Sequence, residues 1–306
     1  MNKIAITGAT SMLGIALIKE CIINGVEVLA IVHEGSNNLS RIPASPLVNI
    51  VECNLENLKK MKAEKDSTYC VFYHFAWAET SNESRNNISA HILNIQYTID
   101  AVGLASKLGC ETFIGAGSQA EYGRVNHTIS PVTRCNPENA YGIAKYAAGK
   151  LSKIACNNIG IRHIWARIFS VYGPNNSNET MIMYIIRELL AGRKPALTKC
   201  EQIWEFIYCE DAARALYLLS ENGGDNIYCI GCGEGKPLLQ YVETIRDLID
   251  PKLPLGIGEK EYSENQVMNL CADITNLIED TGFYQNTNFK EGIAKTISWY
   301  KEENSQ

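Results

Sequence analysis

Two short patterns in this sequence contain residue types that could do chemistry. In AITGATSMLG, Gly8 allows a tight turn after an apolar strand, and Gly14 allows the following helix to pack closely. The free N–H groups at that helix N-terminus suit a pyrophosphate. In YGIAK, Tyr141 and Lys145 lie four residues apart on one helix face, and the ammonium favours the phenolate of a side chain whose free pKa is about 10. The patterns indicate a dinucleotide site and a tyrosine whose charge state a lysine tunes.

Ser11 occupies the place in the turn where a middle glycine usually lets the backbone approach a phosphate most closely. Its side chain narrows that approach, but its hydroxyl could donate a hydrogen bond to a phosphate oxygen. An ordinary turn between a strand and a helix is the alternative for this segment taken alone.

The segments around these patterns alternate between apolar strands and helices. We expect strands at 3–7, 26–32, 48–53, 70–76, 112–117 and 161–168, with helices at 12–24, 86–108 and 138–158. This alternation is typical of an α/β protein with a Rossmann-type, doubly wound parallel sheet that helices cover on both faces.

The alternation breaks after residue 173, where turn-forming residues surround a helix at about 180–191. It returns over residues 205–230, and the tail ends in a helix at about 289–302. We therefore expect a smaller, discontinuous C-terminal lobe that binds substrate. The NAD(P)-binding domain would span 1–173 and receive 207–232 and about 265–280, and the lobe would comprise 174–206, 233–264 and 281–306.

Composition and charge exclude several classes of protein. The 306 residues carry a net charge of −6 and no basic run, which argues against nucleic acid or a membrane as a partner. Eleven cysteines in apolar segments favour buried thiols in the cytoplasm over a disulfide framework. Cys229 and Cys232 form a CxxC, but all five histidines lie before residue 164, so we expect a strand that ends in a turn and no metal site.

Six segments, in order along the chain, resemble motifs of the extended short-chain dehydrogenases/reductases. TGATSMLG resembles the TGxxGxxG turn and departs from it at Ser11, FYHFAWA resembles the HxAA strand, and GSQAEYG resembles the serine motif. YGIAK matches YxxxK, whereas RIFSVYGP and WEFIYCEDAARA resemble RxxNVYGP and RDFIYVDDAARA. They run from residue 4 to about 230 and most resemble the branch that acts on nucleotide-diphosphate sugars as 4-epimerases, 4,6-dehydratases and 4-ketoreductases.

The resemblance implies roles for individual residues. Tyr141 would be the acid or base, Lys145 would also bind the nicotinamide ribose, and Ser118 would hold the substrate oxygen. The residues expected to bind the cofactor are Gly8, Thr10, Ser11, Met12, Leu13, Gly14, His33, Asn54, Leu55, Phe75, Ala76, Trp77, Tyr141, Lys145 and Ile168. Those expected to bind the substrate are Ser118, Gln119, Tyr141, Phe169, Ser170 and Trp204.

The end of the second strand bears on the choice between NADP and NAD. NAD-binding members place an acid there, which accepts a hydrogen bond from the adenosine ribose. Counted from the glycine turn, Val32 fills that place and His33 follows. The lack of a carboxylate there, with Arg41 downstream, favours NADP, whereas Glu34 favours the alternative, NAD. Asn54 is expected to hydrogen-bond the adenine.

Two positions after the serine bear on the reaction. Dehydratases of this branch carry an Asp-Glu pair where Gln119 and Ala120 stand, and neither of these side chains transfers protons at neutral pH, so dehydration is disfavoured. Glu121 either hydrogen-bonds sugar hydroxyls or caps the loop. Trp204 and Glu205 replace the family's Arg-Asp, which leaves Arg167, Arg187 and Arg193 as candidates for binding the diphosphate.

We predict NADP(H)-dependent reduction of a nucleotide-diphosphate 4-keto-6-deoxy sugar at C4, with Tyr141 as the proton donor. A 4-epimerase with NAD is the first alternative, and a non-catalytic dinucleotide-binding sensor is the second. The intact set of Ser118, Tyr141 and Lys145 argues against the sensor. The resemblance also implies a homodimer formed by the helices near 86–108 and 138–158.

Overall fold

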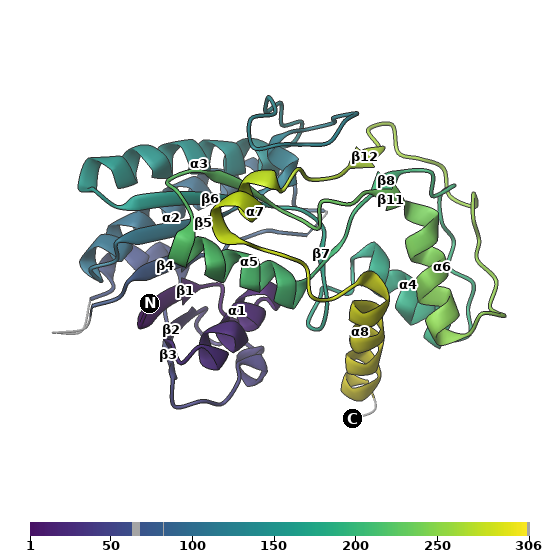
Figure 1. The fold of residues 1–306 in the computed structure, drawn as a ribbon, viewed down its shortest axis with the longest axis horizontal. Helices are drawn as coiled ribbons and strands as arrows, with labels where there is room; N and C mark the ends of the chain where they lie inside the picture. Colours follow the sequence, from purple (N-terminus) through teal and green to yellow (C-terminus); the bar gives the residue numbers. More distant parts are fainter. Residues whose placement is uncertain (63–67, 82, 305–306) are drawn as a thin grey trace.

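The computed structural model describes residues 1–62, 68–81 and 83–304. The domains expected from the sequence also include residues 63–67, 82, 305 and 306, which lie outside the described residues. A seven-stranded parallel sheet forms the centre of the larger part of the molecule, in the order β10-β6-β5-β4-β1-β2-β3 (Figure 1). Its strands are β1 (Lys3–Thr7), β2 (Glu27–Val32), β3 (Val48–Glu52), β4 (Val71–His74), β5 (Thr112–Ser118), β6 (Arg162–Ile168) and β10 (Ile227–Ile230).

The strand order confirms the predicted doubly wound fold. Chain connections run outward from β1 in both directions, which creates a crevice at the carboxyl ends of β1 and β4. The strands β4 and β5 are buried along their whole length, as their continuous apolar sequences require in a sheet covered on both faces.

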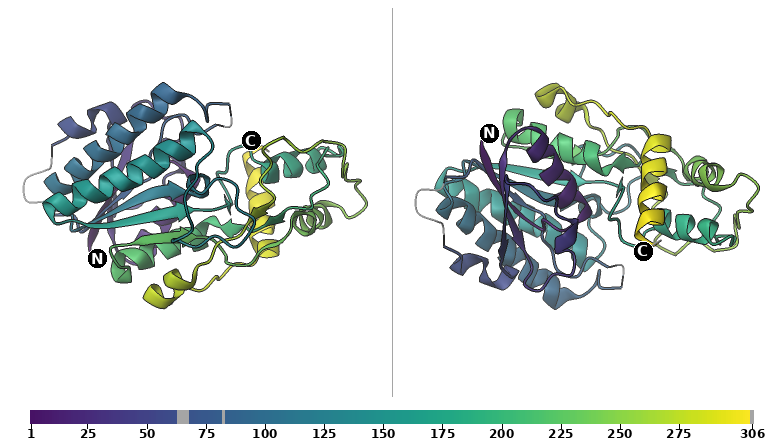
Figure 2. Two further views of the ribbon diagram at one scale, coloured as in Figure 1. Left: turned by 90° about the horizontal axis from the view of Figure 1, so that it is seen from above. Right: turned by 90° about the horizontal axis from the view of Figure 1, so that it is seen from below.

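Helices cover both faces of this sheet (Figures 1 and 2). One layer holds α2 (Ile88–Lys107) and α3 (Ala140–Ile159), and the other holds α1 (Met12–Ile23), α5 (Cys209–Asn222) and α7 (Thr275–Thr281). Asn139 begins α3, because its side chain accepts a hydrogen bond from the Gly142 N–H at 2.8 Å. Gly160, with φ of 72°, ends the same helix. These two caps fix the helix that carries the YGIAK segment.

Trp165 determines how closely α3 approaches the sheet. A side-chain Cβ at Gly115 or Gly149 would lie 2.3 Å or 2.6 Å from the Trp165 ring, so only glycine fits at either place. The ring is 2 % exposed and fills the space between β5, β6 and α3. This packing sets the depth at which the side chains of α3 meet the carboxyl end of β5.

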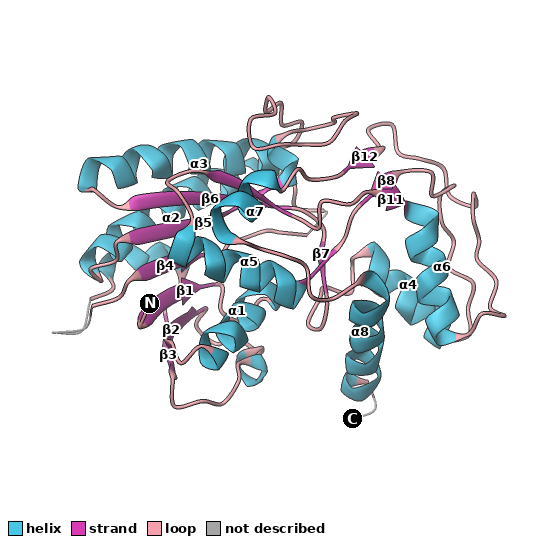
Figure 3. Cartoon of the chain, in the orientation of Figure 1, coloured by secondary structure: helices cyan, strands magenta, loops and turns pink. Residues whose placement is uncertain are grey.

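The remaining elements gather beside the carboxyl ends of the strands (Figures 1 and 3). They are α4 (Met181–Leu190), α6 (Leu238–Ile249), α8 (Phe289–Glu303) and the short strands β7 (Val171–Tyr172), β8 (Ile203–Trp204), β9 (Ile207–Tyr208), β11 (Lys236–Pro237) and β12 (Asn269–Leu270). Sequence analysis did not predict α6, although Pro237 directly before it is a common start signal of helices.

The two cysteines of the CxxC segment have different partners. Cys229 is buried at the end of β10, where its Sγ lies 3.4 Å from the Tyr122 hydroxyl. Cys232 lies beyond the strand and its Sγ is 3.6 Å from Oε2 of Glu205. Burial raises the pKa of each thiol to about 12. The segment is a strand that ends in a turn, as predicted.

Candidate active site

A continuous cleft crosses the carboxyl edge of the central sheet. It consists of a cavity of about 920 Å³ beside β5 and α3 and a cavity of about 660 Å³ beside the glycine turn. Both cavities are lined by Ser11, Phe75, Trp77, Thr80 and Asn176, so they join at the end of β4. We call the larger cavity the reaction cleft and the smaller one the cofactor cleft. Together they are large enough for two elongated ligands that meet at the sheet edge.

The structure brings Ser118, Tyr141 and Lys145 together in the reaction cleft. Ser118 is the last residue of β5, and Tyr141 lies in the first turn of α3, close enough for the Ser118 side chain to lower its pKa. Lys145 lies one turn further along α3 and is 4 % exposed, and its Nζ donates to the Ala116 carbonyl at 2.7 Å. This geometry lets one hydroxyl orient a substrate oxygen while the other exchanges a proton with it.

The ionisation of the tyrosine and the lysine is set by burial. Burial raises the pKa of Tyr141, although the Ser118 hydrogen bond and the Arg85 charge lower it in part. Burial lowers the pKa of Lys145 to about 7, against the opposing attraction of Glu121. At neutral pH, therefore, the phenol keeps its proton and the lysine lies close to its midpoint.

Trp77 covers the lysine from the cleft side. The Lys145 Nζ lies 3.8 Å from the centre of the Trp77 ring, within the range of a cation–π contact. The ring also meets Tyr141 edge to face at 6.0 Å, and its Nε1 donates to Nδ1 of the buried His91 at 3.4 Å. Trp77 therefore lies at the junction of the two clefts, where the cofactor and the substrate would meet.

The glycine turn forms a cradle that fits a dinucleotide phosphate. Gly8 has φ of +73°, and a Cβ there would lie 2.7 Å from the Ala76 N, so glycine alone suits the position. A Cβ at Gly14 would lie 2.4 Å from the Gly8 carbonyl, which shows how tightly α1 follows the turn. Gly14 acts through this packing and does not itself line the cleft, whereas Thr10, Met12 and Leu13 do. The N–H groups of α1 thus open toward the cleft, as anion binding requires.

Ser11 lines both clefts, and its hydroxyl is also bonded within its own turn. It donates to the Gly8 carbonyl at 2.7 Å and accepts from the Gly14 N–H at 3.0 Å, as the N-cap of α1. The residue therefore has a structural role in the turn, and its donation to a phosphate stays a prediction.

The outer end of the cofactor cleft places one expected position and corrects another. Val32 ends β2, is 2 % exposed and lines the cleft, and His33 is the first exposed side chain after it and lines the cleft with Asn38 and Arg41. Asn54 does not line the cleft, because its Oδ1 accepts from the Glu34 N–H at 3.1 Å and clamps the loop after β2. None of the described residues that line this end is an aspartate or a glutamate.

The other expected cofactor residues lie along the same cleft. Leu55, Phe75 and Ala76 line the cofactor cleft, and Ile168 lines the reaction cleft at the end of β6. His74 is buried behind them, where Nδ1 lies 2.9 Å from the Thr7 hydroxyl, and burial lowers its pKa to about 3. His74 is therefore a neutral core residue. Asn94 bonds both backbone groups of Ala78 at 2.9 Å and supports this wall, as expected.

The reaction cleft is also lined by four more of the residues expected to bind the substrate. They are Gln119, Phe169, Ser170 and Trp204. The Trp204 Nε1 donates to the Ser170 Oγ at 2.8 Å, so two residues that differ from the family motifs bind each other. The bond holds the indole in place in the lining of the cleft.

A further cavity of about 480 Å³ extends the reaction cleft between α4 and α6. Of the three arginines proposed for a diphosphate, Arg187 alone lines it, together with Lys260. Arg167 is 2 % exposed and bonds Glu121, and Arg193 bonds Glu188 at 2.8 Å on the surface, so both predictions are wrong. Charge alone could not separate the three.

Two polar residues of the cleft, Arg85 and Gln202, are not among those expected from the sequence. Arg85 lines it and its guanidinium lies 5.2 Å from the centre of the Tyr141 ring. Gln202 is 4 % exposed, and its Oε1 has no hydrogen-bond partner among the residues that the structure describes. It lines both the reaction cleft and the cavity between α4 and α6. Arg85 follows β4 in a polar loop, a signal that sequence could have used. Gln202 has no such signal.

Glu121 lies outside the cleft, which decides between its two predicted roles. Its side chain is fully buried and accepts from the Ser118 N–H at 2.9 Å, so it caps the turn Gln119–Glu121 and does not reach a sugar hydroxyl. In the ranges 1–62, 68–81 and 83–304, no group of three or more His, Cys, Asp or Glu side chains could hold a metal ion. No helix among the same residues is long and apolar enough to cross a bilayer.

Comparisons with known proteins agree with this geometry. The sequence model described as "NAD dependent epimerase/dehydratase family" matches residues 4–231. The chain is 25% identical over 311 residues to a putative UDP-glucose 4-epimerase of Methanocaldococcus jannaschii, which covers 98% of this chain and 99% of that one. It is 24% identical over 305 residues to CDP-abequose synthase of Salmonella typhimurium, covering 96% and 97%.

A solved structure has the same fold. The UDP-N-acetylglucosamine 4-epimerase of Methanobrevibacter ruminantium, in complex with UDP-N-acetylmuramic acid, superposes with a TM-score of 0.88 and 19% identity over 99% of each chain. At this identity the likeness concerns the fold alone. It includes the arrangement of the sheet and of the elements at its carboxyl edge.

Proposed function

The chain belongs to the NAD dependent epimerase/dehydratase family, and as a member of it we propose that the protein reduces the C4 ketone of a nucleotide-diphosphate 4-keto-6-deoxy sugar with NADPH. The single observation that carries this proposal is the pair of Ser118 and Tyr141 hydroxyls at one place in the reaction cleft, since a ketone reduction needs a proton donor at the carbonyl oxygen. The residues that would transfer protons in dehydration are absent, because Gln119 and Ala120 stand in their place and Glu121 is buried behind the turn.

The residues of the reaction cleft supply the proton and the orientation. A bound nicotinamide supplies the hydride to the C4 carbon. The Ser118 hydroxyl holds the C4 oxygen, and the Tyr141 O–H donates its proton to that oxygen as the ketone becomes an alcohol. The Lys145 ammonium stabilises the phenolate that remains until solvent returns a proton.

The shape of the cofactor cleft supports NADP over NAD. His33 and Arg41 line its outer end, where a carboxylate would repel a 2′-phosphate and a cation attracts it. Gly8, Thr10, Met12 and the α1 N-terminus would hold the pyrophosphate. Glu34 is exposed and bonds Asn54 through its backbone N–H, and it does not line the cleft.

The substrate proposal follows from the polarity of the cleft. The aromatic wall of Phe169 and Trp204 suits an apolar edge such as the C6 methyl of a deoxy sugar. Arg187 and Lys260 in the cavity between α4 and α6 suit a diphosphate. We also propose the domain division given above, with residues 174–206, 233–264 and 281–306 as the substrate lobe. The residues of α4 and α6 that line the two cavities, and the packing of α8 against α6, support it.

An NAD-dependent 4-epimerase is the second candidate. Its support is the similarity along nearly the whole chain to a putative UDP-glucose 4-epimerase. Such an enzyme must begin with a base that removes a proton from the sugar hydroxyl, a role that Tyr141 would fill as a phenolate.

One experiment separates the two candidates. The cofactor is released from the purified protein by denaturation and identified, and the protein is then supplied with NADPH and a nucleotide-linked 4-keto-6-deoxy sugar. The reductase is expected to hold exchangeable NADPH and to consume it with the 4-keto sugar. Stoichiometric NAD retained through purification, with no consumption of NADPH, would leave the epimerase as the better proposal.

The outer face of α2 and α3 supports a homodimer. It exposes large apolar side chains, including Ile88 at 65 %, Ile92 at 60 % and Ile154 at 57 %. We expect Ile92→Glu to halve the mass measured by light scattering, because a buried carboxylate opposes the contact. An unchanged mass would contradict this interface. The eleven free cysteines, most of them buried, support a reducing cytoplasm as the location.

A further inference from the structure

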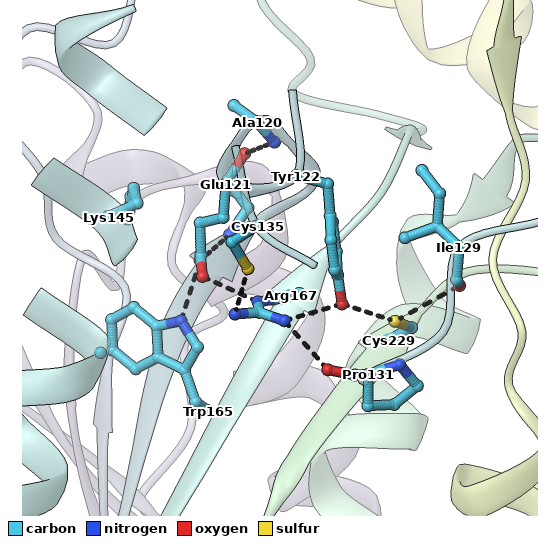
Figure 4. A network of polar contacts seen from close by, with 12 residues as sticks. Ala120, Glu121, Tyr122, Ile129, Pro131, Cys135, Lys145, Trp165, Arg167 and Cys229 are labelled. Atoms are coloured by element: carbon cyan, nitrogen blue, oxygen red, sulfur yellow. Dashed lines mark hydrogen bonds and ion pairs between the residues drawn. The ribbon is translucent and has the colours of Figure 1, made fainter. Parts of the chain in front are cut away.

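An ion pair lies directly behind the serine of the reaction cleft. Glu121 is fully buried and Arg167 is 2 % exposed, and Oε2 of the carboxylate accepts from Nε of the guanidinium at 2.7 Å. Figure 4 shows the carboxylate between the indole of Trp165 and the guanidinium of Arg167. A buried ion pair contributes little net stability compared with apolar side chains of similar size. Stability alone therefore does not account for these two residues.

The second carboxylate oxygen binds the backbone of the serine. Oε1 of Glu121 accepts from the Ser118 N–H at 2.9 Å and from Nε1 of Trp165 at 2.8 Å. The Ser118 hydroxyl in turn accepts from the Ala120 N–H at 3.2 Å, which completes a capping box around the turn. The carboxylate thus fixes the backbone from which the serine side chain reaches Tyr141.

Arg167 is held in place by contacts on its other side. Its Nη1 donates to the Tyr122 hydroxyl at 2.9 Å and to the Pro131 carbonyl at 3.2 Å, and its Nη2 donates to the Cys135 Sγ at 3.0 Å. A guanidinium with three such partners cannot follow a moving carboxylate (Figure 4). Arg167 therefore holds Glu121 at a fixed depth below the turn.

The surrounding chain leaves room for this arrangement. A Cβ at Gly117 would lie 2.6 Å from Oε1 of Glu121 and 2.4 Å from Nε1 of Trp165, so the residue before the serine must be glycine. Neither Glu121 nor Arg167 lines the reaction cleft. The direct contact of the pair with the reaction cleft therefore runs through the Ser118 backbone, and the Glu121 charge acts in addition on the pKa of Lys145.

We propose that Glu121, fixed by Arg167, is a positioning residue that sets the Ser118 hydroxyl against Tyr141 and the substrate oxygen. The proposal rests on the function proposed above for the reaction that Ser118 serves. The carboxylate is required because it alone offers an acceptor to the arginine and another to the serine N–H at the same time.

The Glu121→Gln variant tests this requirement. Its one amide oxygen turns to the Arg167 cation, which leaves an NH2 group facing the Ser118 N–H, donor against donor. We expect kcat to fall by about tenfold to hundredfold, the effect of a misplaced reacting group. Loss of the Glu121 charge also removes an attraction that raises the pKa of Lys145, so the comparison is made at a pH well below 7, where the ammonium is retained. There the KM and the affinity for NADPH are expected to stay within about twofold, because the residues of the cleft are unchanged.

A double-mutant cycle with Ser118→Ala shows whether the effect passes through the serine. In the Ser118→Ala background, Glu121→Gln should change kcat by less than about twofold, since no hydroxyl is left to position. A kcat unchanged in Glu121→Gln, or lowered equally in both backgrounds, overturns the proposal. Cys135→Ala is the matched control, because it removes a contact of Arg167 far from the serine and should leave kcat within about twofold.

The double variant Glu121→Gln with Arg167→Met provides a rescue. Without the cation, the amide oxygen is free to accept from the Ser118 N–H again, and most of the lost kcat should return. A neutral pair also avoids an uncompensated buried charge, so this variant serves where the single one does not fold. Where both variants fold, a double variant with a kcat no higher than that of the single variant contradicts the proposal. Where the single variant does not fold, a double variant with a kcat at least tenfold below that of the parent contradicts it.

Hydrogen exchange of the Ser118 amide tests the anchor without turnover. The exchange should be at least about tenfold faster in Glu121→Gln and return toward the parent rate in the double variant, because the N–H loses and regains its acceptor. Equal exchange in all three proteins overturns the proposal. If the parent protein reduces no 4-keto sugar, the proposed function is refuted instead. The exchange rates then test only whether Glu121 holds the Ser118 N–H.

Discussion

His33 is the position at which one substitution should reverse the choice of cofactor. It is the first exposed side chain after β2 and lines the outer end of the cofactor cleft, whereas Val32 before it is buried in the sheet. An aspartate at position 33 would place a carboxylate beside the 2′-group of the adenosine ribose. It would repel the 2′-phosphate of NADPH and accept a hydrogen bond from the 2′-hydroxyl of NADH.

The magnitude follows from the exposure of the site. Two unit charges 4 Å apart interact by about 1 kcal/mol in water, and a hydrogen bond to a charged group contributes about 1.5–3 kcal/mol where it is sheltered. Both free energies take the lower values here, because His33 and Arg41 are exposed to solvent. Their sum is about 2.5 kcal/mol, so the ratio of NADPH to NADH affinity should fall by about 60-fold in His33→Asp.

Calorimetric titration of each dinucleotide at fixed ionic strength measures this ratio. His33→Asn is the matched control, because it has the size of aspartate without the charge and should change the ratio by less than about fivefold. The difference should shrink at 0.5 M salt, where exposed charges are screened. Equal affinities for the two dinucleotides in the parent protein, or equal shifts in the Asp and Asn variants, would refute the reasoning.

Three further predictions concern the catalytic and phosphate-binding residues. Tyr141→Phe should slow the reduction by about 10² to 10⁴ and leave NADPH affinity within about twofold, and full activity in stopped-flow assays would end its assignment as proton donor. Ser11→Gly should keep NADPH affinity within about tenfold and lower the melting temperature slightly, because the α1 cap is lost. Ser11→Leu should weaken NADPH binding more by blocking the approach of the phosphate, and an unchanged affinity in this variant would show that the turn holds no phosphate. Burial lowers the pKa of Lys145 to about 7, so the ammonium is present below pH 7 and lost above it. NADPH affinity should therefore fall by up to about tenfold per pH unit above pH 7, and a Lys145→Met variant that shows the same slope would assign it to another group.

The sequence by itself determined the elements and the order in which they carry the motifs. Glycine turns, asparagine caps and the i, i+4 spacing of Tyr141 and Lys145 act within a few residues, so backbone geometry alone fixes them. Continuous apolar strands between helices also require a parallel sheet, whose carboxyl edge must carry the residues that follow each strand. The fold and the meeting of Ser118 with Tyr141 therefore followed from local patterns and the family resemblance.

Only the tertiary structure decided which distant side chains meet. Glu121 pairs with Arg167, 46 positions away, and Trp204 bonds Ser170 in the lining of the reaction cleft. The exposure of His33 instead of Val32 depends on where β3 stops pairing with β2. Each outcome depends on the packing of elements far apart in the chain, and the type of a residue does not specify its partner. Two arginines therefore have different surroundings: Arg167 forms a buried ion pair behind the site, whereas Arg187 lines the cavity between α4 and α6.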